Sequence, residues 1–217
     1  PDEPKHKGIT LLLADMKTPG ITVRPLVNMA DEHHFNEVFF DDVKVPKANL
    51  VGEENRGWYH VVIALDFERT AGVSMAAGAK RTLDELTAYV KETTENGKPL
   101  SKDYTVRQKL ANCVIEAEVA RVMAYRVVWM QTKGLIPNYE ASMIKVFASE
   151  GMYRLSNIGL QIMGLHGQLE TDSKWAPLNG RLERAYLSSI GMLIAAGSSE
   201  IQRSIIAMRG LGLPRGA

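Results

Sequence analysis

The sequence predicts a mainly α-helical fold, a C-terminal up-down four-helix bundle preceded by a few antiparallel strands left from a truncated β domain. The chain changes character near residue 53, because short β-rich runs come before this point and long segments of helical period come after it. Breaker residues divide the second part into long pieces, and long helices with short connections form a bundle. We therefore expect residues 1–53 to end a β domain and residues 54–217 to form the helical domain.

Three runs before residue 53 are predicted to be antiparallel strands, and they are GITLLLADM (8–16), GITVRPL (20–26) and NEVFFDDVKVP (36–46). Three strands leave an open edge and bury too little area to be stable without support. We therefore expect the β part to continue outside this chain. The polar opening PDEPKHKG is where such a boundary would fall.

Four helices are predicted after residue 53, over residues 55–93, 103–133, 138–164 and 185–210. The breakers between them are Asn96-Gly97 with Pro99, then Gly134 with Pro137, then a stretch that holds Gly164, Gly167, Pro177 and Gly180. Most of the apolar side chains on these helices, methionines included, are expected to pack in the core.

Composition excludes several classes of function. The 217 residues carry a formal net charge of +1, which gives no electrostatic footprint for nucleic acid. No apolar run approaches the ~20 residues that span a bilayer, so we expect no membrane span and a soluble, cytoplasmic protein. The lone cysteine, Cys113, fits a reducing compartment and a buried structural role. The histidines show no metal-ligand spacing, so no metal is predicted.

Glu68 is the first candidate functional residue, because it falls on the apolar stripe of the first predicted helix. Gly72, Ala76 and Ala79 lack bulk along one ridge of this helix and leave room for another helix or a flat ligand. A carboxylate facing such a space would be partly desolvated, which raises its pKa toward the range of a general base. The alternative is a glutamate that is bonded to an exposed partner, or one that lies at the edge of the stripe.

Four motifs in collinear order carry a resemblance to a known family. They are FFDDVKVPKANLVGEENRGW (39–58), LDFER (65–69), GLQIMGLHG (159–167) and AAGSSEIQRSIIAMRGLGLPR (195–215). In combination they resemble the acyl-CoA dehydrogenase family over essentially the whole chain. The resemblance implies a flavoprotein oxidoreductase of fatty acid metabolism, of which the chain holds the last strands of the middle β domain and the C-terminal bundle. It implies FAD between those two domains and a homo-oligomer, usually a tetramer, and it implies that this piece alone is inactive and retains FAD poorly.

The resemblance also implies a reaction and a base. Family members remove a proton from the α-carbon of an acyl-CoA while the β-hydrogen leaves as hydride to the flavin, giving a trans-2-enoyl-CoA; electron-transferring flavoprotein is the implied electron acceptor. Most members carry the base near the C-terminus, where this chain has Ala196. Isovaleryl-CoA and long-chain acyl-CoA dehydrogenases place it instead in a Glu-Arg pair that matches Glu68-Arg69. Glu68 is therefore the predicted base and Arg69 its supporting residue.

Four further positions match cofactor-binding positions of the family. Gln161 and Gly164 match a loop that touches FAD bound in the neighbouring subunit. Ser198 and Glu200 match residues near the pyrophosphate and adenine end of the flavin, although Ser198 is equally suited to cap the last helix. The family's Arg-x-x-Phe-Gly element is replaced by TTENG at residues 93–97, so an arginine that grips the neighbour's FAD is missing.

Three functions stay open on the sequence. The favoured one is the C-terminal part of an FAD-dependent acyl-CoA dehydrogenase. A second is a subunit of a mixed tetramer with flavin sites built from two different chains, which would account for the missing arginine. A third is a non-enzymatic helical oligomerisation module, and the presence of Glu68 argues against it.

Overall fold

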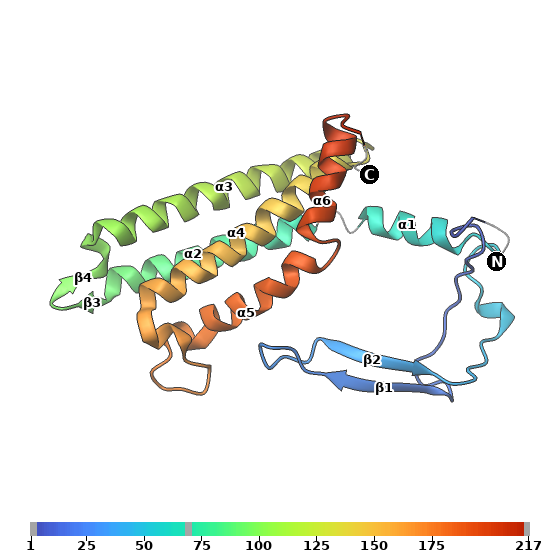
Figure 1. Cartoon of the computed structure of the whole chain (residues 1–217), viewed down its shortest axis with the longest axis horizontal. Coiled ribbons are helices and arrows are strands. Elements are labelled where there is room, and N and C mark those ends of the chain that lie inside the picture. The colour runs from blue at the N-terminus through green and yellow to red at the C-terminus, as the bar shows by residue number, and fades with distance from the viewer. Residues whose placement is uncertain (1–3, 68–70, 215–217) are drawn as a thin grey trace. The chain divides into compact units, whose positions relative to one another are not determined.

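The computed structural model describes residues 4–67 and 71–214 (Figure 1). The chain divides into two compact units, Pro1–Glu68 and Arg69–Ala217.

Among its described residues, the first unit contains a two-stranded antiparallel sheet, a short 3-10 helix (Lys47–Asn49) and one α-helix. Strands β1 (Ile21–Leu26) and β2 (Phe35–Phe40) pair in a register that runs from Ile21 opposite Phe40 to Leu26 opposite Phe35. Helix α1 spans Gly57–Phe67. The second and third predicted strands are thereby confirmed, although the third ends at Phe40, shortly before Asp42 turns the chain with a φ of 50°.

The first predicted strand, over residues 8–16, is wrong. Leu12 forms an isolated bridge with Leu50, and the neighbouring amides and carbonyls bond to residues 49–57 instead of the sheet. The Leu13 amide donates to the Asn49 carbonyl at 3.0 Å, and the Val51 amide donates to the Leu11 carbonyl at 3.0 Å. Residues 8–16 therefore pair with the segment that leads into α1 and do not join the β1–β2 sheet.

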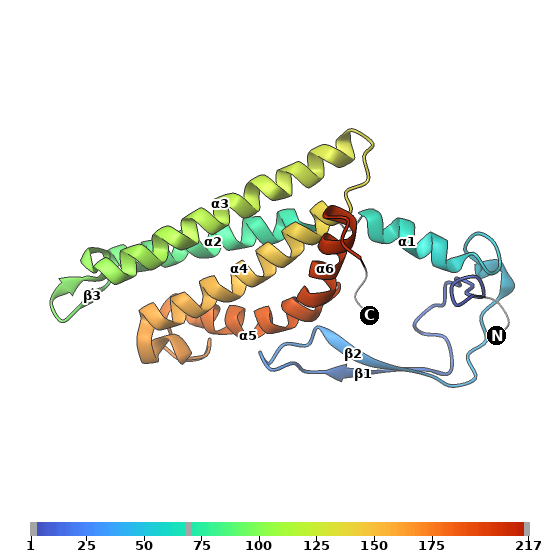
Figure 2. The same ribbon diagram turned by 45° about the horizontal axis from the view of Figure 1, so that its top comes forward.

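The second unit is an up-down helical bundle, as predicted. Helices α2 (Ala71–Glu92), α3 (Tyr104–Thr132), α4 (Tyr139–Met163) and α5 (Arg181–Ile194) run alternately in opposite directions in both views (Figures 1 and 2). Asp103 begins α3 by accepting a hydrogen bond from the Val106 amide at 2.9 Å. Strands β3 (Thr94–Glu95) and β4 (Lys98–Pro99) form a hairpin between α2 and α3, with Asn96 and Gly97 both at positive φ.

The fourth predicted helix, over residues 185–210, is wrong as a continuous element. Helix α5 begins earlier, at Arg181, and ends at Ile194, and a separate helix α6 (Ser199–Ile205) follows, extended by a π-helical turn (Ile206–Gly210). The interruption lies at Ala196 and Gly197, whose φ angles of 55° and 89° are incompatible with a right-handed helix.

Small residues let the helices approach one another closely in the core. A Cβ atom on Gly72 would lie 2.7 Å from Ile144, so the ridge of small residues on α2 receives α4. A Cβ atom on Gly159 of α4 would lie 2.6 Å from Leu182 of α5. At Gly72, the ridge that the sequence left open to a helix or a ligand is therefore occupied by a helix.

Candidate functional site

Gln161 and Gly164 lie where α4 ends. The side chain of Gln161 is exposed, and its Oε1 accepts a hydrogen bond from Lys109 Nζ of α3 at 2.8 Å. Gly164 ends the helix with φ 60° and ψ −142°, a conformation that suits glycine alone. No described atom lies within 4 Å of the place where a Cβ would be, so this backbone faces open space.

Ser198 and Glu200 lie at the start of α6. Ser198 is the N-cap residue, and its Oγ accepts a hydrogen bond from the Ile201 amide at 3.4 Å. A hydrogen bond from the Ser198 side chain is the main cause that lowers the pKa of Glu200, and Arg203 and Lys145 lower it further. Ser198 therefore caps the helix in this structure, and its role toward a phosphate stays a prediction.

The two pairs of predicted residues lie toward opposite ends of α4. The turn between α5 and α6 packs against Lys145 of α4, which donates one hydrogen bond to the Gly197 carbonyl of that turn and one to the Leu193 carbonyl near the end of α5. Gln161 follows sixteen residues later on the same helix, which corresponds to roughly 24 Å of helical rise. Figures 1 and 2 show α6 against one end of α4, with the chain turning toward α5 at the other. The structure thus brings Gln161 and Gly164 together, and Ser198 and Glu200 together, but separates the two pairs.

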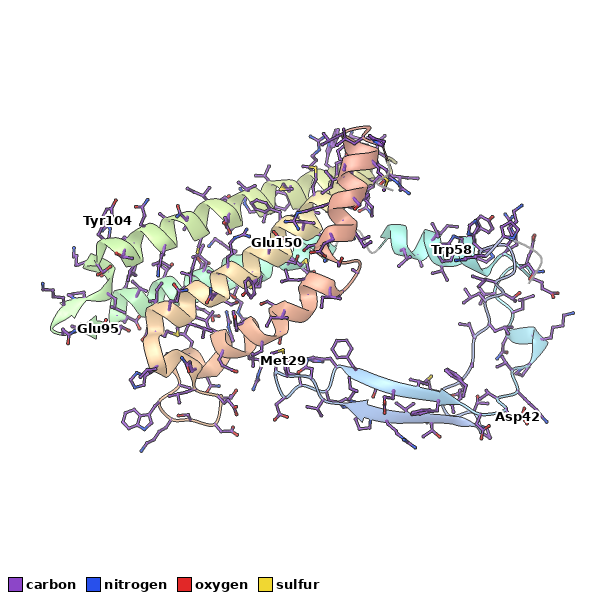
Figure 3. The ribbon with its side chains drawn as sticks, in the orientation of Figure 1. Met29, Asp42, Trp58, Glu95, Tyr104 and Glu150 are labelled. Carbon is purple, nitrogen blue, oxygen red and sulfur yellow. The ribbon has the colours of Figure 1, made fainter. Side chains whose placement is uncertain are left out.

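Charged pairs fix α6 on the bundle beside this turn. Glu150 of α4, labelled in Figure 3, accepts from Arg203 Nη2 of α6, with 2.7 Å between Nη2 and Oε1. Arg154 of α4 lies between Glu150 and Glu116 of α3, at 3.8 Å and 3.1 Å. The chain of alternating charges joins α3, α4 and α6, so the start of α6 has a defined place on the bundle.

Glu68 and Arg69, the predicted base and its supporting residue, lie outside the described residues. Helix α1 is described to Phe67 and helix α2 from Ala71. The prediction that Glu68 faces the acyl group therefore stays a prediction.

An open cleft of about 380 Å³ lies between α2 and α3. Its floor is formed by small apolar side chains such as Val73, Ala76 and Ala124. Two basic residues at its rim, Lys80 and Arg81, pair with acidic residues one turn further along α2. The rim is thus neutralised locally, and none of the predicted site residues that the structure describes lines the cleft.

The part of the chain that the structure describes holds neither a metal-binding cluster nor a membrane span. There, no cluster of three or more His, Cys, Asp or Glu side chains is arranged to hold a metal ion. Within the same residues, no helix combines the length and the apolar character needed to cross a bilayer.

The sequence model of a protein family matches most of this chain. The model of the acyl-CoA dehydrogenase C-terminal domain matches residues 55–211. The chain belongs to the acyl-CoA dehydrogenase family.

Relatives within the family match over nearly the whole chain. Acyl-CoA dehydrogenase FadE26 of Mycobacterium tuberculosis is 33% identical over 97% of this chain and 53% of its own length. An acyl-CoA dehydrogenase of Bacillus subtilis is 32% identical over 98% of this chain and 54% of its own length. The crystal structure of the ChsE4–ChsE5 complex from M. tuberculosis superimposes with a TM-score of 0.89 at 33% identity, covering 98% of this chain and 55% of that chain. The chain thus spans about half the length of the curated acyl-CoA dehydrogenases it matches.

The sequence did not assign a role to two residues that hold this site, one of which, Gln202, lies inside the last acyl-CoA dehydrogenase motif. Lys145 and Gln202 both donate to carbonyl groups of the turn that precedes α6. No local signal marks Lys145 in the sequence, because the carbonyl groups that it reaches are 48 and 52 residues away.

Proposed function

We propose that this chain is the C-terminal part of an FAD-dependent acyl-CoA dehydrogenase in which Glu68 takes the α-proton of the acyl-CoA. The observation that carries the proposal is the family match over residues 55–211, taken with the methyl side chain at Ala196. Ala196 cannot accept a proton, so the base has to come from another segment, and Glu68 in the Glu-Arg pair is the acid at the alternative position that the family uses.

The residues present fit a flavin dinucleotide in part. Gly164 offers an exposed backbone with open space beside it, which lets a ligand approach closely. Gln161 uses its carbonyl oxygen on Lys109, and its amide NH₂ group is a suitable donor to a phosphate oxygen. The hydroxyl of Ser198 serves α6 instead, so phosphate binding there would need it to change partners.

In this proposal, FAD and the residues of this chain take different parts in the reaction. When bound, FAD supplies the acceptor for the hydride that leaves the β-carbon. The Glu68 carboxylate takes the proton from the α-carbon, and the absence of a second carboxylate at position 196 keeps like charges apart. Because the Gln161 pair and the Ser198 pair lie toward opposite ends of α4, we assign them to two different flavins, one of them bound mainly by a neighbouring subunit.

A mixed oligomer is the second candidate, and a specific observation favours it. The ChsE4–ChsE5 structure, which this chain resembles at 33% identity, is a complex of two proteins. The segment at residues 93–97 leads through β3 into the turn of the β3–β4 hairpin and carries no arginine, so the arginine that the resemblance implies at the neighbouring flavin is missing there. A different chain would then supply that contact in half of the sites. Native mass measurement of the full-length protein, alone and with a second acyl-CoA dehydrogenase chain from the same organism, tests this candidate.

The test of the enzyme proposal is flavin reduction. The purified full-length protein should show the visible absorption of bound flavin, and straight-chain and branched acyl-CoA substrates should be tried anaerobically for bleaching of that band. Bleaching by at least one acyl-CoA supports the proposal, and transfer of the electrons to electron-transferring flavoprotein would extend it. A colourless protein that binds no FAD with or without a partner chain would favour the helical oligomerisation module instead.

Relocating the carboxylate gives a sharper control. Glu68→Gly combined with Ala196→Glu moves the base to the position that most family members use. Because both positions should face the same α-carbon, the double variant should regain part of the activity that Glu68→Gly alone loses, limited by orientation. No recovery in a double variant that still binds FAD would argue that the two positions do not share a substrate.

A further inference from the structure

The turn between α5 and α6 is held by two side chains that donate to its carbonyl groups. Lys145 Nζ donates to the Gly197 carbonyl at 2.8 Å and to the Leu193 carbonyl at 3.2 Å. Gln202 Nε2 donates to the Ala196 carbonyl at 2.7 Å. Three carbonyl groups at the end of α5 and in the turn are thus satisfied by donors from α4 and α6.

The backbone of this turn needs such support. Ala196 has a φ of 55°, in the left-handed region that residues with a Cβ atom disfavour. Gly197 follows at 89°, and a Cβ atom there would lie 2.6 Å from Gln202 Nε2. A side chain larger than hydrogen at position 197 would therefore displace the donor that holds Ala196. Left-handed non-glycine residues persist where the surrounding structure over-determines them, and Lys145 and Gln202 supply that constraint here.

Lys145 is suited to this task by its position. It projects from α4 as a half-buried side chain, and burial is the main cause that lowers the pKa of its ammonium group. One of the carbonyl groups it reaches, that of Leu193, belongs to the C-terminal end of α5, where the helix dipole favours a cation. Glu150 and Glu200 act in the opposite direction and favour the charged amine.

We infer that Lys145 and Gln202 are positioning residues that fix the α5–α6 turn and thereby hold Ser198 and Glu200 in place for the cofactor. The inference rests on the proposed function for its cofactor part, and on the hydrogen bonds alone for its structural part. Ser198 directly follows Gly197, so loss of the carbonyl contacts at residues 193, 196 and 197 frees the start of α6 to shift.

Hydrogen exchange in the full-length protein tests the structural part. Lys145→Met keeps the length and apolar stem of the side chain and removes the donor. We expect peptides that cover residues 193–202 to exchange at least about tenfold faster, because loss of hydrogen bonds from a charged group shifts local opening by that order. Lys80→Met is the matched control, since Lys80 pairs with Asp84 on the exposed surface of α2. Peptides of α3 should be unchanged in both variants.

Cofactor affinity tests the positioning role. The dissociation constant for FAD should rise at least about tenfold in Lys145→Met and in Gln202→Leu, and stay at the wild-type value in Lys80→Met. Gln202→Leu also covers the case in which Lys145→Met fails to fold. Unchanged exchange over residues 193–202 would overturn the inference, and so would faster exchange with unchanged FAD affinity. Failure of the wild-type protein to bind FAD would instead refute the proposed function, and the exchange measurement would still decide whether the two residues hold the turn.

Discussion

Gly164 ends α4 with φ 60° and ψ −142°. Its substitution therefore tests the effect of backbone conformation separately from side-chain packing. Gly164→Ala meets no atom within 4 Å, yet we expect it to lower the free energy of unfolding by about 1–3 kcal/mol, because L residues are strained in this conformation. Gly191→Ala is the matched control, since it also faces open space but lies inside α5, where alanine is favoured by about 0.5–1 kcal/mol. Urea unfolding measures the free energy of unfolding of both variants. Equal changes in the two variants would contradict the strain that we expect at position 164.

Cys113 provides a residue-scale test of the core. Burial is the main cause that raises the pKa of its thiol to about 11, with Glu116 adding to the effect. Since alkylation needs the thiolate, iodoacetamide should modify the Cys113 peptide about a hundredfold more slowly in the folded protein than in urea at pH 8. The folded-state rate should keep rising with pH up to about 11. A plateau near the ordinary thiol pKa, read by mass spectrometry, would show that Cys113 is accessible and unperturbed.

Individual residues differ in how far the sequence determines their roles. Ser198 was predictable as a helix cap, because serine type and position are local signals. Lys145 was not, since its carbonyl partners are 48 and 52 residues away in the sequence. The left-handed conformation of Ala196 was not predictable either, because alanine carries no preference for it and tertiary contacts impose it.

Among the elements, α4 is the centre of the bundle, and its glycines separate close packing from helix propensity. Gly159→Ala would bring a Cβ to 2.6 Å from Leu182, which is 1% exposed and has no room to retreat. We expect a loss of about 1–3 kcal/mol in the free energy of unfolding. Gly151→Ala on the same helix finds its nearest atom at 3.7 Å and should gain up to about 1 kcal/mol from helix propensity. Urea midpoints that move in the same direction for both would contradict this packing.

Element boundaries followed the sequence where the signal was local. The breakers at Gly134 and Pro137 separate α3 from α4 as predicted, and the Asn96-Gly97 pair makes a hairpin turn. The segment over residues 8–16 has strand-like composition but pairs with residues 49–57, because β composition does not specify the partner. The interruption of the last helix depends on donors from α4 and α6, so a helical period alone could not reveal it.

At the scale of the whole molecule, the chain spans about half the length of the relatives it matches. We therefore expect residues 1–217 by themselves to bind FAD weakly and substoichiometrically, because the β-domain contacts to the flavin that the family resemblance implies lie outside them. Isothermal titration with FAD measures this, and circular dichroism confirms that the sample tested is helical. Tight binding of one FAD per chain would contradict the prediction. The domain boundary at residue 53 stays a prediction as well.

The rate of flavin reduction by acyl-CoA in Glu68→Gln, measured anaerobically in the full-length protein, tests the central claim most directly. Glutamine keeps the size and hydrogen-bonding capacity of the side chain and removes the base, so FAD should remain bound. General-base removal commonly slows the chemical step by ~10²–10⁴-fold, and we expect a loss in that range. Reduction at the wild-type rate would show that Glu68 is not the base.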